Sequence, residues 1–208
     1  MKLSNYILVT FLVFIVGCSL VLFISARSHK NDKDLTNREY PLDDVNINVI
    51  VAESEALIRI HTSDTNSLSI HYPVNEREPE NFYRISNDTL YVSRMILQSQ
   101  ASRRVDIYIR SILSSVVAKS NSDIRITSFF SDKLEIYAEQ ALVDISNITI
   151  DEIVIQAIHS NISIYSTTET ASVSAKLERE SNLRINSAKN ISKVNIEKDE
   201  SSRCNLYQ

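Results

Sequence analysis

The sequence predicts an all-β fold: a β-solenoid of the right-handed parallel β-helix type behind an N-terminal transmembrane helix. Three observations predict it, namely a long uncharged stretch near the N-terminus, aliphatic pairs that recur about every ten residues, and a single glycine in the whole chain. The chain has 208 residues, of which 43% are hydrophobic and 23% charged, as is typical of one globular domain joined to an anchor. We expect an anchor over 1–27, a linker over 28–39 and the solenoid domain over 40–208.

Residues 7–26 form the predicted membrane anchor, because none of them is charged. At a rise of about 1.5 Å per residue, a helix of this length spans about 30 Å, the thickness of the hydrocarbon core of a bilayer. A cleaved secretory signal fits less well, since the apolar run exceeds the usual ~15 residues and no small-x-small site precedes Arg27. A lipoprotein signal is the alternative: residues 15–18 resemble a lipobox, in which Cys18 would be acylated, although the apolar run continues beyond it.

The side of the membrane on which the domain lies is a separate question. Arg27, Lys30, Lys33 and Arg38 follow the anchor, whereas only Lys2 precedes it, and the positive-inside rule would place the domain in the cytoplasm. A signal anchor followed by a polar, β-rich domain is nevertheless a common layout of exported proteins, and the lipoprotein alternative also requires export. We therefore expect a single-pass protein of the cell membrane with its soluble domain on the extracytoplasmic, periplasmic side.

Aliphatic residues at positions i and i+2 mark a series of short strands after the linker. In the second half of the chain successive pairs are about ten residues apart, and the residue inside each pair is polar except Val154. Alternation with period two is typical of strands that have one buried face and one face in water. The pairs are Ile124/Ile126, Leu134/Ile136, Val143/Ile145, Ile153/Ile155, Ile162/Ile164, Val173/Ala175, Leu183/Ile185, Val194/Ile196 and Cys204/Leu206.

The same pattern recurs less regularly upstream. Residues 72–83 interrupt it with Pro73, Pro79 and the charged run Glu76–Glu80, and we expect a loop there. No segment after the anchor has the pattern of an amphipathic helix. The upstream pairs are Ile47/Val49, Ile58/Ile60, Leu68/Ile70, Leu90/Val92 and Ile107/Ile109.

Regularly spaced short strands are compatible with a sandwich, a barrel or a solenoid. Hairpin folds favour tight turns of the Asn-Gly, Asp-Gly or Gly-Gly type, and the only glycine, Gly17, lies in the anchor. A solenoid places about two strands in each coil of about 20 residues and stacks equivalent aliphatic side chains as ladders inside. We expect about eight coils at ~4.8 Å each. Ser, Asn and Asp would replace glycine at the corners, because Asn and Asp tolerate left-handed backbone and their side chains cap turns.

Composition excludes several classes of function. Without glycine beyond the anchor, the domain has no Gly-rich phosphate loop, no dinucleotide fingerprint and no nucleophile elbow of the hydrolases. The net charge is −4 and no basic cluster stands out, so nucleic acid is not an expected partner. Cys18 lies in the anchor and Cys204 close to the last residue, so we expect no disulfide within the domain.

No set of residues predicts a metal, cofactor or catalytic site. His61 and His71 each follow a strand pair and could stack on neighbouring strands, but no carboxylate has the phase that would complete a metal site. Adjacent surface histidines are therefore expected. Paired acids fall in apparent turns, where solvated carboxylates are the usual case and glycosidase-like catalysis the rare one. These acids are Asp43-Asp44, Asp151-Glu152 and Asp199-Glu200, and the other histidines are His29 and His159.

Aromatic residues offer a second candidate feature. Tyr108, Tyr137 and Tyr165 could form an outward aromatic patch suited to a protein or glycan, although core or scattered surface positions are commoner. Phe129 and Phe130 interrupt a turn and would either cover the core or make a lateral contact.

The order of features from about Tyr40 onward resembles the head GIN domain family of auto-transporter-adhesin-like proteins of the bacterial envelope. The resemblance rests on the segments 45–49, 57–60 and 68–70, on Asn87-Asp88-Thr89-Leu90-Tyr91-Val92, which is similar to a g-d-T-L-x-I element, and on 105–109 followed by 122–126. Members of the family carry glycine at corners where this chain has Ser, Asn or Asp. The resemblance implies a right-handed β-helix-like stack at the cell envelope and transfers no catalytic residues.

These features predict a membrane-tethered, non-enzymatic bacterial envelope protein that presents a β-helical surface for adhesion or for binding a protein or glycan, without a cofactor. One alternative is a small carbohydrate-active β-helix enzyme that uses turn carboxylates, and another is a membrane-anchored signalling partner with a cytoplasmic domain. The strand edges of the last coil, around Cys204, need a cap or a partner, and an end-to-end homodimer would supply one.

Overall fold

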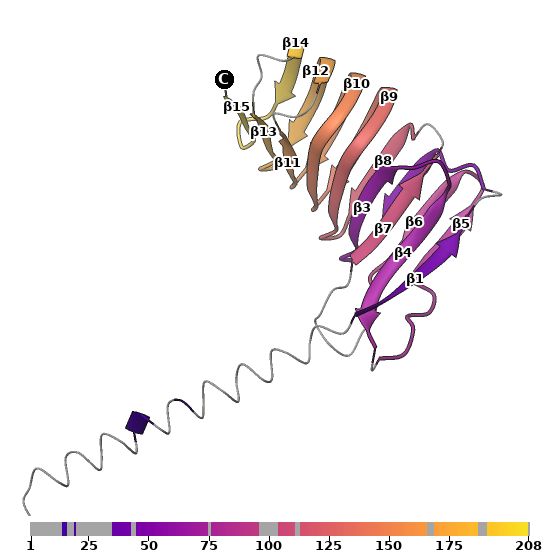
Figure 1. Ribbon diagram of the computed structural model, residues 1–208. Coiled ribbons are helices and arrows are strands. Elements are labelled where there is room, and N and C mark those ends of the chain that lie inside the picture. Colours follow the sequence, from indigo (N-terminus) through magenta and orange to yellow (C-terminus); the bar gives the residue numbers. More distant parts are fainter. Residues whose placement is uncertain are drawn as a thin grey trace, which may run out of the picture.

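The computed structural model describes residues 35–42, 45–74, 76–95, 104–110, 113–165, 169–186 and 191–207, together with Phe14, Ile15 and Ser19. Within these ranges the fold is all-β, with 15 strands in one hydrogen-bonded system (Figure 1). The strands are β1 (Leu35–Pro41), β2 (Val49–Ala52), β3 (Leu57–Thr62), β4 (Ser67–Pro73), β5 (Tyr83–Ser86), β6 (Thr89–Val92), β7 (Arg104–Ile109), β8 (Ser115–Lys119), β9 (Asp123–Glu139), β10 (Leu142–Ile158), β11 (Asn161–Ile164), β12 (Glu169–Glu178), β13 (Asn182–Asn186), β14 (Ile191–Lys198) and β15 (Arg203–Tyr207).

The predicted anchor falls almost wholly outside the described residues. Among those residues, no helix is both long and apolar enough to cross a membrane, so the anchor over 7–26 stays a prediction. Cys18, His29 and the pair Asp43-Asp44 also lie outside the described ranges. β1 begins at Leu35, inside the stretch predicted as the linker.

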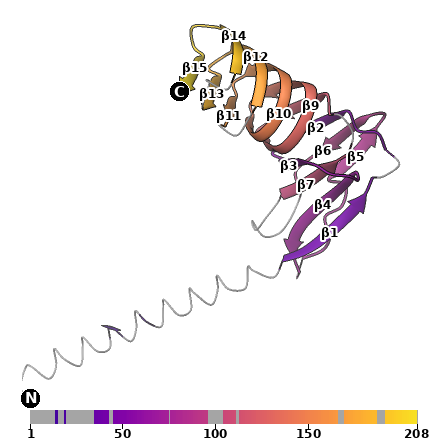
Figure 2. The ribbon, with the colours of Figure 1, turned by 45° about the horizontal axis from the view of Figure 1, so that its top comes forward.

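The C-terminal half is a parallel β-solenoid of about four turns, built from β8 to β15 (Figure 2). β9 and β10 each run for 17 residues and cover two sides of a coil, since each bends at one residue with positive φ, Ser128 (53°) and Asn147 (52°). Their first arms stack with β3, β11, β13 and β15, and their second arms with β8, β12 and β14. The prediction of about eight coils is wrong, because the strands before β8 do not follow one another along the stack.

The predicted aliphatic ladders are confirmed as the buried lining of this solenoid from β9 to β13, whereas in the last two pairs Val194, Ile196 and Cys204 are only partly buried and Leu206 is exposed. Ile124, Val143, Ile162 and Leu183 are in register from strand to strand, and each is at most 1% exposed. The second arms bury one further position beyond each predicted pair, as Ala138, Ala157 and Leu177. Each turn therefore covers the apolar face of the turn next to it, and burial of this area is the main favourable term in folding.

One predicted pair, Ile47/Val49, is wrong in its second member. Ile47 is buried, but it precedes β2, and within the strand Ile50 is buried while Val49 lies half-buried on the outer face. The amides of Asn48 and Val49 both donate to the carbonyl of Asp88, at 2.9 and 3.1 Å. Strand alternation therefore starts only at Val49, one residue out of phase with the pair predicted from Ile47.

Strand order departs from sequence order in the N-terminal half (Figure 1). β7 lies between β4 and β3, and β2 lies between β6 and β8. The pairs β1–β4, β4–β7 and β5–β6 are antiparallel, and Asn87, with a φ of 53°, turns the β5–β6 hairpin. A parallel stack in sequence order is thus confirmed from β8 onward and wrong before it. The loop predicted over 72–83 is confirmed between β4 and β5, except at its ends, where Tyr72 and Pro73 belong to β4 and Tyr83 to β5.

The corners of the solenoid adopt left-handed backbone without glycine. Ser120 and Asn121 have positive φ, as predicted for Ser and Asn at corners. Gln140 and His159 take the same conformation in the next turns, at 51° and 49°, where a left-handed residue costs about 1–2 kcal/mol. The amide of Gln140 donates to the carbonyl of Ile158 on the following turn at 2.9 Å. Stacking between turns therefore holds a conformation that these side chains do not favour by themselves.

A small residue points inward beside each corner and ties one turn to the next. The hydroxyl of Ser181 accepts a hydrogen bond from the amide of Ser160 at 3.2 Å and donates one to the carbonyl of Glu178 at 2.6 Å. The hydroxyl of Ser202 accepts from the amide of Ser181 at 3.2 Å. By contrast, the buried hydroxyl of Ser122 has no hydrogen-bond partner in the described part of the chain. The six inward residues are Ala56, Ser122, Ala141, Ser160, Ser181 and Ser202, all at most 8% exposed.

We predict that Ser181→Ala lowers the free energy of unfolding by about 1–3 kcal/mol, because it leaves the buried Ser160 amide without its partner and removes one of the two hydrogen bonds to the Glu178 carbonyl, which keeps the one from the His159 amide. Ser122→Ala is the matched control and should leave stability unchanged or slightly raised, since its hydroxyl satisfies nothing. Urea unfolding of the full chain in mild detergent, followed by circular dichroism, measures both. Equal losses of unfolding free energy in the two variants would contradict a stabilising role of the Ser181 hydrogen bonds.

Candidate binding surface

The sheet that runs from β1 through β4, β7, β3, β9, β10, β11 and β13 to β15 presents a polar outer face. Its inward positions are the aliphatic ladders, so the alternate residues point away from the core. Asp106, Arg59, Arg125 and Asp144 are in register on the four consecutive strands β7, β3, β9 and β10. Neighbouring strands lie about 4.8 Å apart, and the four charged groups therefore form one short, charge-balanced row across the sheet.

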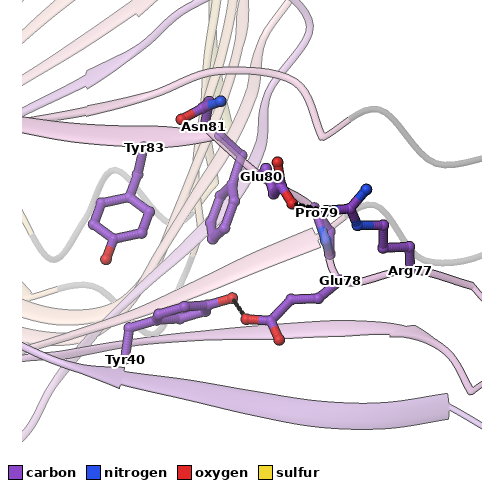
Figure 3. A pocket seen from close by; sticks show the side chains of 8 residues that line it. Tyr40, Arg77, Glu78, Pro79, Glu80, Asn81 and Tyr83 are labelled. Carbon is purple, nitrogen blue, oxygen red and sulfur yellow. Dashed lines mark hydrogen bonds and ion pairs between the residues drawn. The ribbon is translucent and has the colours of Figure 1, made fainter.

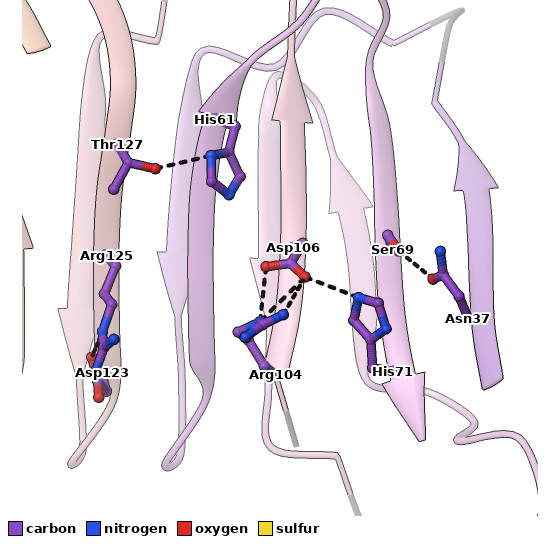
Figure 4. A network of polar contacts seen from close by, with 9 residues as sticks. All are labelled: Asn37, His61, Ser69, His71, Arg104, Asp106, Asp123, Arg125 and Thr127. Atoms are coloured by element: carbon purple, nitrogen blue, oxygen red, sulfur yellow. Dashed lines mark hydrogen bonds and ion pairs between the residues drawn. The ribbon is translucent and has the colours of Figure 1, made fainter. Parts of the chain in front are cut away.

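Asp106 is the most buried member of the row. Its side chain is 5% exposed, and its carboxylate lies 3.0 Å from Nε of Arg104 and 3.3 Å from Nε2 of His71 (Figure 4). The guanidinium also donates from Nη2 to Oδ2 at 3.1 Å. A buried carboxylate is tolerated only when it is paired and hydrogen-bonded, so these contacts fix Asp106 and Arg104 in place.

A ring pair flanks the charged row. His61 stacks on Tyr108, with ring centroids 5.4 Å apart and planes at 23°. Nδ1 of His61 lies 2.9 Å from the hydroxyl of Thr127 on the next strand (Figure 4). Burial lowers the pKa of His61 below its usual 6.5. The positive charges of Arg59 and Arg104 lower this pKa further, whereas the negative charge of Asp106 raises it in part. His61 is therefore neutral at pH 7, and the stack adds a rigid aromatic surface beside the charges.

The structure separates the two histidines that the sequence placed on neighbouring strands. β7 lies between β3, which carries His61, and β4, which carries His71, so the prediction of adjacent histidines is wrong. Parallel pairing of β3 with β7 inserts Tyr108 and Asp106 between them. Within the described ranges, no group of three or more His, Cys, Asp or Glu side chains could hold a metal ion. His159 occupies a corner with positive φ and is exposed.

The three candidate tyrosines do not share one patch. Tyr108 lies on β7 and Tyr165 directly follows β11, both in the sheet of the charged row, whereas Tyr137 lies on the second arm of β9 beside Val117 of β8. Tyr137 is half-buried on the outer face of its strand. Its partial burial, followed by the nearby Glu139, raises the pKa of its hydroxyl.

Phe129 and Phe130 divide between core and surface, because the positive φ of Ser128 turns the chain just before them. Phe129 is buried in register with Ile148, and Phe130 is exposed.

The two acid pairs within the described residues are not gathered into a cleft. Asp151-Glu152 lies inside β10 rather than in a turn, which corrects the prediction for that pair. Asp199-Glu200 does lie in the turn before β15. There Asp199 accepts hydrogen bonds from the amides of Arg179 (2.6 Å) and Ser202 (2.8 Å). These hydrogen bonds, that from Arg179 first, hold the pKa of Asp199 well below its usual range, so this carboxylate closes a corner rather than acting as an acid.

Two hollows lie on the described surface, and the smaller one adjoins the charged row, because Asp123, which lines it, lies 3.9 Å from Nε of Arg125 (Figure 4). The larger, of about 560 Å³, is lined by Tyr40 and residues 77–83 (Figure 3). The Tyr40 hydroxyl donates a hydrogen bond to Glu78, and burial followed by this bond raises the Tyr40 pKa. The ring of Tyr40 packs on Phe82 at 5.7 Å and on Tyr83 at 5.6 Å. These aromatic contacts cover the end of the core, so the residues that line this hollow serve packing.

The smaller hollow, of about 500 Å³, runs along one corner of the solenoid between Asn121 and Asn161. Asp123 lines it, and one of its carboxylate oxygens is buried without a hydrogen-bond partner among the described residues. Burial raises the pKa of Asp123, although Arg125 opposes the shift.

Comparison with known proteins supports the fold and no closer relationship. No protein-family model matches the chain, and a search of curated protein sequences finds no match. A solved structure of a candidate adhesin from Bacteroides fragilis is similar, with a TM-score of 0.54 and 15% identity over 84% of this chain and 97% of that chain. At this identity the likeness concerns the fold alone. The resemblance to the head GIN domain family is not confirmed by any family model.

Two further solved structures match more weakly. A candidate cell adhesion protein from Clostridium sporogenes has a TM-score of 0.33 and 11% identity over 84% of this chain and 100% of that chain. A candidate lipid-binding protein from Parabacteroides distasonis has a TM-score of 0.35 and 12% identity over 85% of this chain and 98% of that chain.

We predict that His61 titrates below pH 6.5 in the folded protein. Because the unfolded chain then binds a proton more readily than the folded one, stability is retained above about pH 6.5 and falls as the pH drops from there to the folded pKa. An NMR titration of the imidazole signals of the full chain measures the pKa, and His61→Gln assigns the signal. A pKa above 6.5 for this ring would refute the described burial.

Proposed function

We propose that this protein is a non-enzymatic binding protein of the bacterial cell envelope, with an adhesion-like role. The observation that carries the proposal is the in-register row of Asp106, Arg59, Arg125 and Asp144 on four hydrogen-bonded strands. The partner would be a protein or a glycan that offers alternating polar groups. The similar Bacteroides fragilis structure, itself described as a candidate adhesin, supports a binding role rather than a catalytic one.

The row is suited to recognition because strand pairing fixes where its members lie before any partner arrives. Arg59 and Arg125 face each other on paired strands, and Arg125 is exposed. A guanidinium presents a planar fork of donors to carboxylate, phosphate or hydroxyl oxygens. The stacked rings of His61 and Tyr108 lie beside this row, and an aromatic face beside polar groups fits sugars and peptides alike. Preorganised side chains reduce the entropy that binding costs.

We predict that Arg59→Glu combined with Arg125→Glu reduces binding at least tenfold, which corresponds to about 1.4 kcal/mol. Beads coated with the full chain are tested against arrays of glycans and of extracellular matrix proteins. Lys133→Glu combined with Lys176→Glu is the matched control, since it makes the same change of charge on β9 and β12 in the opposite sheet. Equal binding by both double variants would contradict the proposed surface.

The same glycan panel tests the carbohydrate-active alternative. Release of reducing sugar by the full chain, lost in a variant of Asp151 and Glu152, would replace the proposal by an enzyme. We expect no release, because the paired acids in the described part of the chain lie in a strand interior and at a capped corner.

We further propose that residues 7–26 tether the protein to the cell membrane and that the solenoid lies on the extracytoplasmic side. Support comes from the uncharged run alone. A reporter that is active only after export, fused to the C-terminus, should be active, and deletion of 7–26 should abolish its activity. A reporter active only in the cytoplasm would instead favour the signalling alternative. Loss of membrane attachment in Cys18→Ser would favour the lipoprotein alternative.

A further inference from the structure

We propose that two copies of this chain join end to end through the outer edges of β14 and β15, by antiparallel pairing about a two-fold axis. β14 pairs with its counterpart around Asn195, and β15 pairs with its counterpart around Asn205. The inference does not depend on the proposed binding surface, which lies on the face of the sheet rather than at its end.

The two ends of the stack differ (Figure 2). At the N-terminal end β1 pairs only with β4 and β5 only with β6 among the described strands, but Phe82, which is buried under Tyr40 and Tyr83, covers the core there. At the other end, β14 pairs only with β12 and β15 only with β13, within the described residues. Among the described residues nothing covers the ladder there: Leu206, in register with the buried Ile185, is 50% exposed, and the outward Tyr207 beside it is 48% exposed.

The free edges carry their unpaired backbone groups on the same residues that continue the ladder. The amide of Arg203 donates to Ser181 of β13 at 2.8 Å, and the amide of Asp199 donates to Leu177 of β12 at 3.1 Å. In a parallel strand, alternate residues direct both N–H and C=O to the same neighbour. The odd-numbered residues therefore bond inward, and the even-numbered ones, among them Val194 and Cys204, present N–H and C=O at the edge.

The sequence of β14 is self-complementary in an antiparallel register centred on Asn195. Val194 then forms a hydrogen-bonded pair with Ile196 of the second copy, and the two apolar side chains extend the ladder across the junction. Lys193 lies opposite Glu197 of the second copy on the outer face, and the two-fold axis generates each pair twice. Opposite charges directly across a sheet are stabilising, whereas like charges are not.

β15 fits the same arrangement. A register centred on Asn205 places Cys204 opposite Leu206 of the second copy, so the two half-exposed ladder residues cover each other. Arg203 then lies opposite Tyr207 of the second copy, a combination that permits a cation–π contact. A two-fold axis that passes through both pairs of strands generates both pairings at once, and it closes the assembly at two copies, because both copies contribute the same surface to one isologous interface.

Disulfide trapping tests the register. In the full chain with Cys18→Ser and Cys204→Ser, Asn195→Cys places two thiols in a directly opposed pair without hydrogen bonds, with Cα atoms about 4.5 Å apart, within the range a disulfide requires. Oxidation in mild detergent should give a covalent dimer on a non-reducing gel. Ser174→Cys is the matched control: it lies next to Asn195 in register, but on the interior strand β12, and should stay monomeric. Equal cross-linking of the two variants would overturn the proposal.

A charge exchange tests the same interface without a cross-link. Lys193→Glu or Glu197→Lys alone should raise the dimer dissociation constant about tenfold, since each places like charges opposite one another twice, and the double exchange should restore dimerisation. Analytical ultracentrifugation of the full chain measures the mass, and circular dichroism checks that each variant is folded. A monomeric wild type at the highest soluble concentration, or a dimer indifferent to both single variants, would overturn the proposal.

Discussion

Each turn of the solenoid buries its aliphatic side chains against the equivalent side chains of the turns above and below, so equivalent positions must stay in register. Ile124, Val143 and Ile162 satisfy this requirement in consecutive turns. A slip of one residue in any strand would turn its apolar face to water. The register also fixes the corners, where only a small inward residue fits and where the backbone must turn left-handed. Ser160 and Ser181 are the small inward residues and join the turns by hydrogen bonds, whereas the left-handed backbone falls on their neighbours His159 and Glu180.

The same register organises the outer face, where the core imposes no demand. Because Arg59 and Arg125 belong to equivalent positions of paired strands, the register that aligns the ladder residues also places these two side by side on the outer face. Asp106 departs from the rule that outward residues are solvated, since it is nearly buried and paired with Arg104 and His71. That cluster joins β4 to β7, where the sheet changes from parallel to antiparallel pairing. The outer face is thus most tightly fixed beside the proposed binding row.

The ends of the stack follow from the same constraint. A ladder ends in unpaired backbone and exposed aliphatic side chains unless something covers it. At the N-terminal end the chain covers itself, by reversing strand direction in β4 and β5 and by packing Phe82 and Tyr40 over the core. At the other end the described residues leave Leu206 and Tyr207 exposed, and the pairing proposed above covers them with a second copy.

Period-two alternation by itself determined which residues line the core, because a side chain's face within one strand depends only on local backbone geometry. Burial of Ile124, Leu183 and the other ladder residues followed from it, as did the loop between β4 and β5. The prediction failed at Val49 because Asn48, which precedes β2, is not part of the strand, so the alternation does not run from Ile47 into β2. Only the tertiary structure decided which strands are neighbours, since β7 meets β3 across more than forty residues of chain through backbone bonds that carry no sequence signal. The charged row and the Asp106 cluster depend on those neighbours, and the sequence alone could not assemble them.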